Sequence, residues 1–205
     1  MNLATLSSIL IGYLFGSIQF AYLMGRIAGG IDIREYGSGN AGASNITTAL
    51  GIKWGVVVGG LDILKGTLAV LVVKWVYPGE IELAFLAGLM AVVGHIFPFY
   101  LRFRGGKGVA ALVGVMFGIQ WYLGLLFVLL VAIPAFLTDY IVSGSFTTFL
   151  ALPIITWYSD YSSLVLTLSL GLVALCFYLH RGNIRRILAG EEVKIRSVLF
   201  KSDPL

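Results

Sequence analysis

Charged residues are scarce in this sequence. Of its 205 residues, 12% are charged and 59% are hydrophobic, and the mean hydropathy is +0.95. A soluble globular domain usually has about a quarter of its residues charged. The shortage excludes a soluble fold for the chain, because one soluble core could not bury so much apolar surface. The composition therefore predicts an integral membrane protein, with membrane lipid as a partner.

Cysteine and histidine are also rare, with one and two residues respectively. The single cysteine, Cys176, excludes an internal disulfide, and its apolar surroundings predict a small buried side chain. The two histidines, His95 and His180, give no Cys/His cluster of the kind that binds metal. We therefore expect neither a metal nor a cofactor, and we expect no nucleic-acid partner.

Apolar runs separated by turn residues, charges or glycine-rich loops follow one another along the whole chain. A spanning helix takes about 20 apolar residues, so the runs predict an all-α, polytopic membrane protein with about seven transmembrane helices, some of them short. No stretch is left for a soluble domain, and residues 1–205 are treated as a single membrane-embedded domain. The runs cover residues 3–24, 54–76, 82–99, 109–119, 121–137, 141–157 and 162–179.

Twelve of the fourteen lysine and arginine residues fall in three segments between or after these runs. Cytoplasmic loops attract Lys and Arg, so all three segments are expected on the cytoplasmic side. This predicts an outer N-terminus at Met1, a cytoplasmic C-terminus, and four rather than two crossings between residues 108 and 181. The twelve residues are Arg26, Arg34, Lys53, Arg102, Arg104, Lys107, Arg181, Arg185, Arg186, Lys194, Arg196 and Lys201.

The loop after the first run is rich in glycine, serine and asparagine between Gly37 and Asn45. Glycine exposes backbone N–H groups, and Ser and Asn add donors, so such a loop can cradle a phosphate. A flexible interfacial loop is the alternative, and the pattern alone does not separate the two. The candidate substrate contacts are Ser38, Gly39, Asn40, Gly42, Ser44 and Asn45.

The second loop, from Gly94 to Gly108, packs charge and glycine together just before the run that starts at residue 109. A lysine among glycines at a helix start combines a mobile ammonium, backbone donors and the positive end of the helix dipole, which suits a phosphate dianion. A positive-inside topology signal would explain the cations, but it does not require the glycines, so a ligand site is favoured. The candidates are Arg102, Arg104, Gly105, Gly106, Lys107 and Gly108, with His95 in a supporting role.

A third cluster, His180 with Asn183, stands at the end of the last run. On a continuing helix their three-residue spacing puts an imidazole and an amide on one face, where both can address the same ligand. A basic anchor to anionic lipid headgroups is the alternative, and it suits the nearby arginines better than these two residues.

Two further pairs are candidates because of their depth in the membrane. Asp62 and Lys65 lie within a span, three residues apart, and ionisable residues there mark function by default. A purely structural ion pair is equally consistent with them, so we assign them to a supporting role. The span count places Ser143 and Ser145 near the cytoplasmic face, as candidate substrate contacts.

In this order and at these spacings, the clusters resemble the bacterial acyl-phosphate:glycerol-3-phosphate acyltransferase family, often called the PlsY family. The resemblance spans nearly the whole chain, and Ser143-Gly144-Ser145 is similar to a serine-containing segment of the family. The motifs that carry it are Gly37 to Asn45, Leu61 to Gly66, Gly94-His95 with Pro98 and Gly105 to Ala110, and His180-Arg181 with Asn183-Ile184, Arg186, Gly190 and Glu191.

Two positions depart from the pattern of that family. Thr48 stands where the family usually has an arginine, and Ala111 stands where its second motif often ends in threonine. Arg34, Lys53 or an arginine of the second loop are the candidates to replace the missing cation.

The resemblance implies transfer of an acyl group from acyl-phosphate to the sn-1 hydroxyl of glycerol 3-phosphate. The products are lysophosphatidic acid and phosphate, in the first step of phospholipid synthesis. It also implies a bacterial inner-membrane protein, expected to be a monomer, with its active site on the cytoplasmic face. The expected catalytic residues are Lys107, Ser38, His180 and Asn183. The implied roles are phosphate binding by Lys107, Gly105 and Gly106, loop contacts by Ser38, Asn40 and Asn45, acceptor binding by His180 and Asn183, and support by Glu191.

Two questions stay open at this stage. The proton of the acceptor hydroxyl can pass to His180 or to a substrate phosphate, whose second pKa is near 6. The alternative of a different class is a membrane transporter or channel for an anionic metabolite, which would use the same loops at broken helices.

Overall fold

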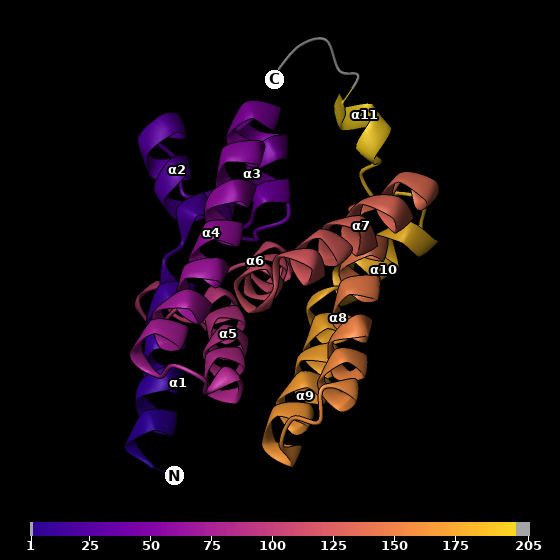
Figure 1. The fold of residues 1–205 in the computed structure, drawn as a ribbon. Coiled ribbons are helices and arrows are strands. Elements are labelled where there is room, and N and C mark those ends of the chain that lie inside the picture. Colours follow the sequence, from indigo (N-terminus) through magenta and orange to yellow (C-terminus); the bar gives the residue numbers. More distant parts are fainter. Residues whose placement is uncertain (1, 200–205) are drawn as a thin grey trace. The chain divides into compact units, whose positions relative to one another are not determined.

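The computed structural model describes residues 2–199, and all its regular elements are helices (Figure 1). The predicted all-α class is therefore confirmed for this part of the chain. The chain divides after Gly124 into two compact units, each described by itself below. Met1 and Lys201, which the topology prediction uses, lie outside the described residues.

The first unit contains six α-helices and two short 3-10 turns. The first two helices share one apolar run of 27 residues, which is broken at Ile18 and Gln19. The predicted single helix over 3–24 is thus wrong in detail. The elements are α1 (Leu3–Ser17), α2 (Phe20–Gly29), η1 (Ile33–Glu35), α3 (Ala43–Leu50), α4 (Ile52–Val76), α5 (Ile81–Ile96), η2 (Phe99–Leu101) and α6 (Val109–Ile119).

Close backbone contact joins α1 to α5. A Cβ atom at Gly12 would stand 2.0 Å from the carbonyl oxygen of Ala87, and one at Gly16 would stand 2.0 Å from that of Ala91. Small residues allow such approach between helices in lipid, where packing rather than apolar burial drives association. The two glycines therefore set the distance between α1 and α5.

The contact between α4 and α6 follows the same rule and fixes the depth of α6. A Cβ atom at Gly66 would stand 2.2 Å from the carbonyl oxygen of Ala111. At the other end, Lys74 Nζ donates to the carbonyl oxygens of Gly118 (2.9 Å) and Ile119 (2.7 Å). The short helix α6 therefore begins beside the middle of α4 and ends beside its last turn.

The predicted number of about seven membrane-spanning helices is borne out only in part. Every predicted run contains a helix, but α6 has 11 residues, about 16 Å at 1.5 Å per residue. Within residues 2–199, five helices are long and apolar enough to cross a membrane, or six if a bent pair counts as one span.

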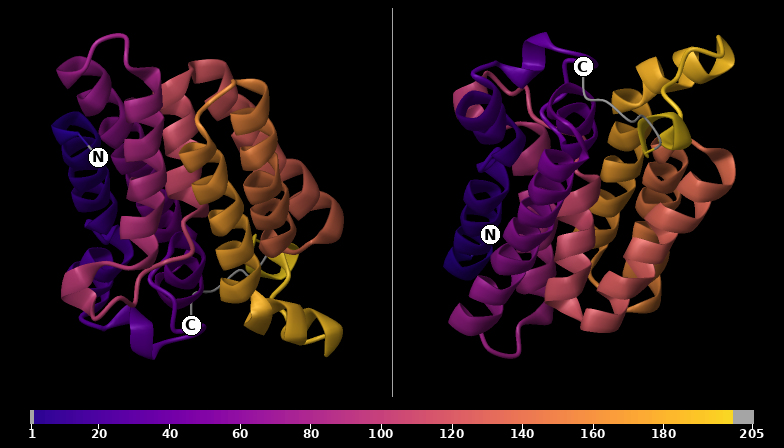
Figure 2. Two further views of the ribbon diagram at one scale, coloured as in Figure 1. Left: turned by 90° about the horizontal axis from the view of Figure 1, so that it is seen from below. Right: turned by 90° about the horizontal axis from the view of Figure 1, so that it is seen from above.

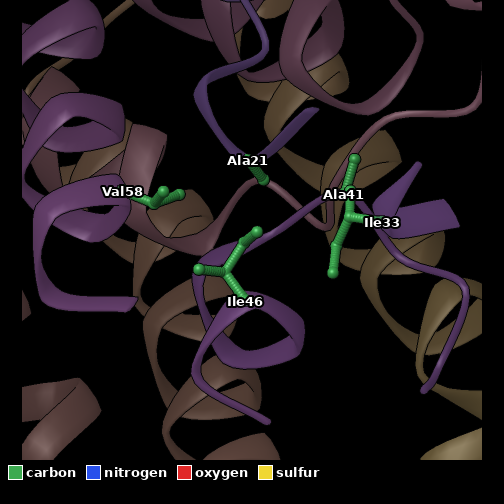
Figure 3. Close-up of a cluster of buried hydrophobic side chains, with 5 residues drawn as sticks. All are labelled: Ala21, Ile33, Ala41, Ile46 and Val58. Atoms are coloured by element: carbon green, nitrogen blue, oxygen red, sulfur yellow. The ribbon is translucent and has the colours of Figure 1, made fainter. Parts of the chain in front are cut away.

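A small apolar core holds the first loop against its neighbours (Figure 3). Ile33 and Ala41, from the loop, are fully buried with Ile46 of α3. Ala21 of α2 and Val58 of α4 complete the cluster. The glycine-rich loop is therefore anchored on both sides by buried side chains.

The second unit begins within α7 and is built around a pair of helices, α8 and α9, that lie side by side (Figure 2). The rings of Phe146 and Phe177 stack between them, with centroids 4.7 Å apart. The last span does not continue straight, because α10 bends by 45° from α9 at His180. The helices are α7 (Trp121–Thr138), α8 (Ile141–Tyr158), α9 (Ser163–Leu179), α10 (Arg181–Leu188) and α11 (Ile195–Leu199).

Candidate functional site

Asn45, at the start of α3, organises the glycine-rich first loop. Its side-chain Nδ2 donates to the carbonyl oxygens of Ile33 (2.9 Å), Tyr36 (2.9 Å) and Asn40 (3.0 Å). Its Oδ1 accepts from the backbone N–H of Ser38 (3.0 Å). Asn45 is only 4% exposed, so its amide holds the loop in shape. In the structure Asn45 shapes the loop, and its contact with substrate stays a prediction.

Of the other predicted residues of this loop, Gly42 is buried and the rest lie nearer the surface. Ser38, Gly39 and Ser44 are exposed, and Asn40 is half-buried. Gly42 caps α3, whose first N–H groups have no intrahelical acceptor and point out of the helix start. The backbone N–H groups of Ser38, Gly39 and Gly42 are bonded within the loop and its helix start, so the remaining donors are side-chain groups and the first N–H groups of α3.

An ion pair fixes the segment that leads into this loop. Arg34 donates to Asp32 through Nε (2.9 Å) and Nη2 (2.6 Å), and its Nη1 donates to the carbonyl oxygen of Leu101 (3.0 Å). The hydrogen bonds from Arg34 lower the pKa of Asp32 to about 2, and they raise the pKa of Arg34. Because its guanidinium is committed to these partners, Arg34 is a poor replacement for the family arginine absent at Thr48.

The glycines of the second loop are required by packing against the end of α5. Gly105 N–H donates to Ile96 O and Gly106 N–H donates to His95 O, both at 3.0 Å. A Cβ atom at Gly105 would stand 2.0 Å from His95 O, and one at Gly106 would stand 2.0 Å from His95 Nε2. These two N–H groups therefore donate to backbone within the protein, whereas the sequence interpretation gave them to a phosphate.

The structure brings the first and second loops together. Ala41 N–H donates to the carbonyl oxygen of Gly105 at 3.2 Å, beside the Arg34 contact to Leu101. Lys107 follows in a half-buried position, one residue before Gly108, which caps α6 at φ +85°. The first N–H groups of α6 lack intrahelical acceptors. Lys107 and the N–H groups at the start of α6 therefore follow directly after Gly105 and Gly106, whose own N–H groups are bonded to the end of α5.

The two arginines of the second loop are exposed. Arg102 and its neighbour Phe103 both have positive φ, at 56° and 59°. Two consecutive non-glycine residues in this region are uncommon and cost conformational energy. The turn leaves Arg102 and Arg104 exposed, within the loop that precedes Lys107.

A buried polar cluster lies beneath the second loop. Lys65 Nζ is 2.8 Å from Asp62 Oδ1 and donates to the carbonyl oxygen of Ile18 at 2.5 Å. His95 Nδ1 is 3.5 Å from the same Asp62 oxygen. All three side chains are at most 3% exposed. Their contacts are with the protein interior, which fits the supporting role assigned to them.

In the second unit, His180 has a defined tautomer. Its Nδ1 is 2.9 Å from the carbonyl oxygen of Cys176, which can only accept, so the neutral ring carries its proton on Nδ1. The ring packs edge-on against Phe146, with centroids 5.5 Å apart, and is 3% exposed. The basic nitrogen of neutral His180 is consequently Nε2.

Asn183 is held by a carboxylate that the sequence interpretation missed. Asn183 Nδ2 donates to Glu192 Oε1 at 2.5 Å, and Arg186 Nε donates to Glu192 Oε2 at 2.6 Å. The predicted support residue, Glu191, has an exposed side chain. The carboxylate that bonds to Asn183 is that of its neighbour Glu192, and nothing in the sequence distinguishes the two adjacent glutamates.

The two predicted serines of this unit bond to nearby backbone. Ser143 Oγ donates to the carbonyl oxygen of Tyr140 at 2.8 Å. Ser145 is 4% exposed, and its Oγ is 3.5 Å from the carbonyl oxygen of Ile141. The Ser145 carbonyl oxygen lies 3.9 Å from the sulfur of Cys176, one turn before His180. Ser145 and His180 therefore belong to the same packed end of α8 and α9.

Among residues 2–199, no group of three His, Cys, Asp or Glu side chains is arranged to hold a metal ion. A surface hollow lined by Trp157, Asp160, Tyr161, Ser163 and Leu166 lies at the turn between α8 and α9. None of the predicted site residues lines it.

Comparisons with known proteins converge on one family. Its sequence model, described as glycerol-3-phosphate acyltransferase, matches residues 6–190. The chain is 41% identical over 190 residues to the glycerol-3-phosphate acyltransferase of Bradyrhizobium sp. (strain BTAi1), covering 92% of this chain and 93% of that protein. It is 43% identical over 189 residues to that of Thermoanaerobacter sp. (strain X514), covering 91% and 93%.

A solved structure is similar over the same extent. It is the crystal structure of PlsY (YgiH), an integral membrane glycerol 3-phosphate acyltransferase, in its glycerol 3-phosphate form. The TM-score is 0.83 at 35% identity, and the match covers 96% of this chain and 99% of that one. A second form of PlsY, with lysophosphatidic acid, matches with a TM-score of 0.77.

Proposed function

The chain belongs to the glycerol-3-phosphate acyltransferase family, and from this premise we propose that it transfers an acyl group from acyl-phosphate to the sn-1 hydroxyl of glycerol 3-phosphate. The products are lysophosphatidic acid and inorganic phosphate, in the first step of phospholipid synthesis. The observation that carries the proposal is the match to PlsY in its glycerol 3-phosphate form, which extends over nearly the whole of both chains. Membership of an acyltransferase family decides against the transporter alternative.

Lys107 is the cation to which we assign the substrate phosphate. It stands where the half-buried end of the second loop meets the start of α6, with the first loop bonded alongside. An ammonium group and the N–H groups at a helix start both favour the binding of an anion. Ser38, Asn40 and Ser44 add side-chain donors from the first loop, Gly39 gives the backbone of that loop its turn, and Arg102 and Arg104 add positive charge nearby.

The reaction needs positioning more than activation, because phosphate is already a good leaving group. The hydroxyl oxygen of glycerol 3-phosphate attacks the acyl carbon, the bond from that carbon to the phosphate oxygen breaks, and the hydroxyl proton passes to a base. His180 Nε2 is the basic nitrogen of the neutral ring and can take the proton, as can a substrate phosphate. Charge on the departing phosphate is stabilised by Lys107.

Asn183 is proposed to bind the acceptor beside His180. Its amide is fixed by Glu192, which in turn bonds to Arg186. Such a fixed amide loses little freedom when it binds a hydroxyl or a phosphate oxygen. Ser143 and Ser145 lie at the start of α8 as further proposed contacts.

For the membrane arrangement we propose seven crossings in a single domain, with the N-terminus outside and the C-terminus and all three site clusters in the cytoplasm. The described basic residues outside the spans support this orientation. A bacterial inner-membrane location and a monomeric state are part of the same proposal. Acyl-phosphate then approaches from the lipid, and glycerol 3-phosphate approaches from the cytoplasm.

The function is tested by phosphate release from palmitoyl-phosphate by the purified protein in detergent. We expect release only when glycerol 3-phosphate is present, with one lysophosphatidic acid formed per phosphate. Release without the acceptor would indicate a phosphatase, and no release under either condition would contradict the proposal. Palmitoyl-coenzyme A as donor is the control, and equal turnover with it would refute the acyl-phosphate assignment.

A further inference from the structure

The break between α1 and α2 is an unusual feature for the interior of an apolar span. Ile18 and Gln19 leave helical geometry, with ψ angles of 113° and 88°. Backbone groups freed within a membrane are tolerated only where the protein satisfies them. At this break, the Ile18 carbonyl oxygen accepts from Lys65 Nζ, and the Ser17 carbonyl oxygen accepts from the hydroxyl of Tyr100 at 2.9 Å.

Gln19 connects the break to the second loop at two points. Its backbone N–H donates to Tyr100 Oη at 3.2 Å, and its side-chain Nε2 donates to the carbonyl oxygen of His95 at 2.9 Å. That same His95 oxygen accepts the N–H of Gly106, the residue before Lys107. One carbonyl group is therefore shared by the break in the first span and by the segment that presents Lys107.

The burial of Gln19 indicates that its amide is needed for the hydrogen bond to the His95 carbonyl oxygen. The side chain is 1% exposed, and its Oε1 is buried without a hydrogen-bond partner among the described residues. An unsatisfied buried oxygen costs about 1–3 kcal/mol. An apolar side chain of the same size would avoid this cost, so stability alone does not account for an amide here.

We propose that Gln19 is a positioning residue of the active site, which acts through the His95 carbonyl to set Gly106 and, through Gly106, Lys107. The inference rests on the acyltransferase function proposed above. Gly106 packs closely against two neighbours, because a Cβ there would stand 2.0 Å from His95 Nε2 and 2.8 Å from the Ala41 carbonyl oxygen. A rotation of the His95 carbonyl is thus passed to the start of α6 and to the ammonium of Lys107.

The variant Gln19→Met removes the amide and keeps the length of the side chain. We expect kcat/KM to fall about fivefold to tenfold, the loss of one hydrogen bond in positioning, with the melting temperature unchanged or raised because the unsatisfied oxygen is gone. Tyr13→Phe is the matched control. It also removes one hydrogen bond from α1 to the end of α5, at Phe97 O (2.8 Å), but that carbonyl does not bond to Gly106.

The outcomes separate the possible roles. Lower activity together with a lower melting temperature would mean that Gln19 is structural, and activity equal to that of Tyr13→Phe would refute the positioning role. Gln19→Glu, which loses the Nε2 donor, should reproduce the kinetic loss. If the wild-type protein shows no acyl transfer at all, the proposed function fails. If only the difference between Gln19→Met and the control is absent, the function stands and this inference alone is overturned.

Discussion

At the scale of single residues, Lys107 and its glycine neighbours have separate tasks. Gly105 and Gly106 let the loop fold back onto the end of α5, where their N–H groups donate to backbone carbonyl oxygens. The sequence could predict that glycine matters beside Lys107, but not that packing requires it. That reason lies in the carbonyl groups of His95 and Ile96, which only the fold brings close.

Lys107→Ala should lower kcat/KM by about a hundredfold to a thousandfold, the usual effect of removing one group that stabilises developing charge. Arg104→Ala is the matched control, because it removes a cation from the same loop at an exposed position. Both variants should keep the melting temperature of the wild type. An equal loss of activity in both would show that the loop acts through its overall charge and not through Lys107.

Glu192 and Glu191 offer a second matched pair. Glu192→Gln should raise the KM for glycerol 3-phosphate and cost about 1–3 kcal/mol in stability, because it weakens the bonds to Asn183 and Arg186. Glu191→Gln, at an exposed position, should change neither quantity. Steady-state kinetics and thermal unfolding of the two purified variants provide the test. The reverse result would restore Glu191 as the supporting carboxylate.

The Asp32 carboxylate makes stability depend on pH in a defined window. Its pKa is lowered from 3.8 to about 2 in the folded protein. Its contribution to the free energy of unfolding is therefore complete above about pH 4 and is lost as the pH falls through 2. Asp32→Asn should therefore melt below the wild type at pH 5, and the gap should close between pH 4 and 2. Glu35→Gln, on the same loop, is the control. A gap that stays constant over this range would mean that Asp32 acts only by its shape.

At the scale of elements, the existence of the helices was predictable and the break in the first span was not. Ile18-Gln19-Phe20 contains neither proline nor glycine, and apolar periodicity continues through it. The groups that satisfy the broken backbone, Lys65 and Tyr100, are 47 and 83 residues away from their acceptors. Local pattern carries no information about such distant partners.

The contact between α4 and α6 can be tested with two glycines of α4. Gly66→Ala should lower the melting temperature and reduce turnover, because the new Cβ would stand 2.2 Å from the Ala111 backbone and push away the helix that begins beside Lys107. Gly60→Ala, where nothing lies within 4 Å of the new Cβ, should be neutral or slightly stabilising. Equal tolerance of the two substitutions would contradict the close approach of α4 and α6.

At the scale of the whole molecule, composition predicted a membrane protein, and the orientation inferred from charge placement stays a prediction. Helix length alone does not decide the number of crossings, because α6 is too short to span by itself. Its ends are informative instead. Since α6 finishes at the last turn of α4, through Lys74, it should reach the side of the membrane where α4 ends. The second loop would supply the remaining depth on the cytoplasmic side.

Cysteine labelling of intact cells measures whether α6 crosses. The native Cys176 is 1% exposed, so single cysteines can be added to the wild-type sequence with little background reaction. If α6 counts as a crossing, Ser159→Cys at the turn between α8 and α9 should react from outside with an impermeant maleimide. Glu35→Cys and Glu191→Cys should react only after the cells are opened.

The three positions together exclude the competing arrangements. Without a crossing at α6, every later segment changes sides, so Ser159→Cys would be protected and Glu191→Cys would react from outside. An inverted protein with seven crossings would instead expose Glu35→Cys and Glu191→Cys together. Only the proposed arrangement leaves both glutamate positions, and with them the first loop and the His180 cluster, on the side where glycerol 3-phosphate is available.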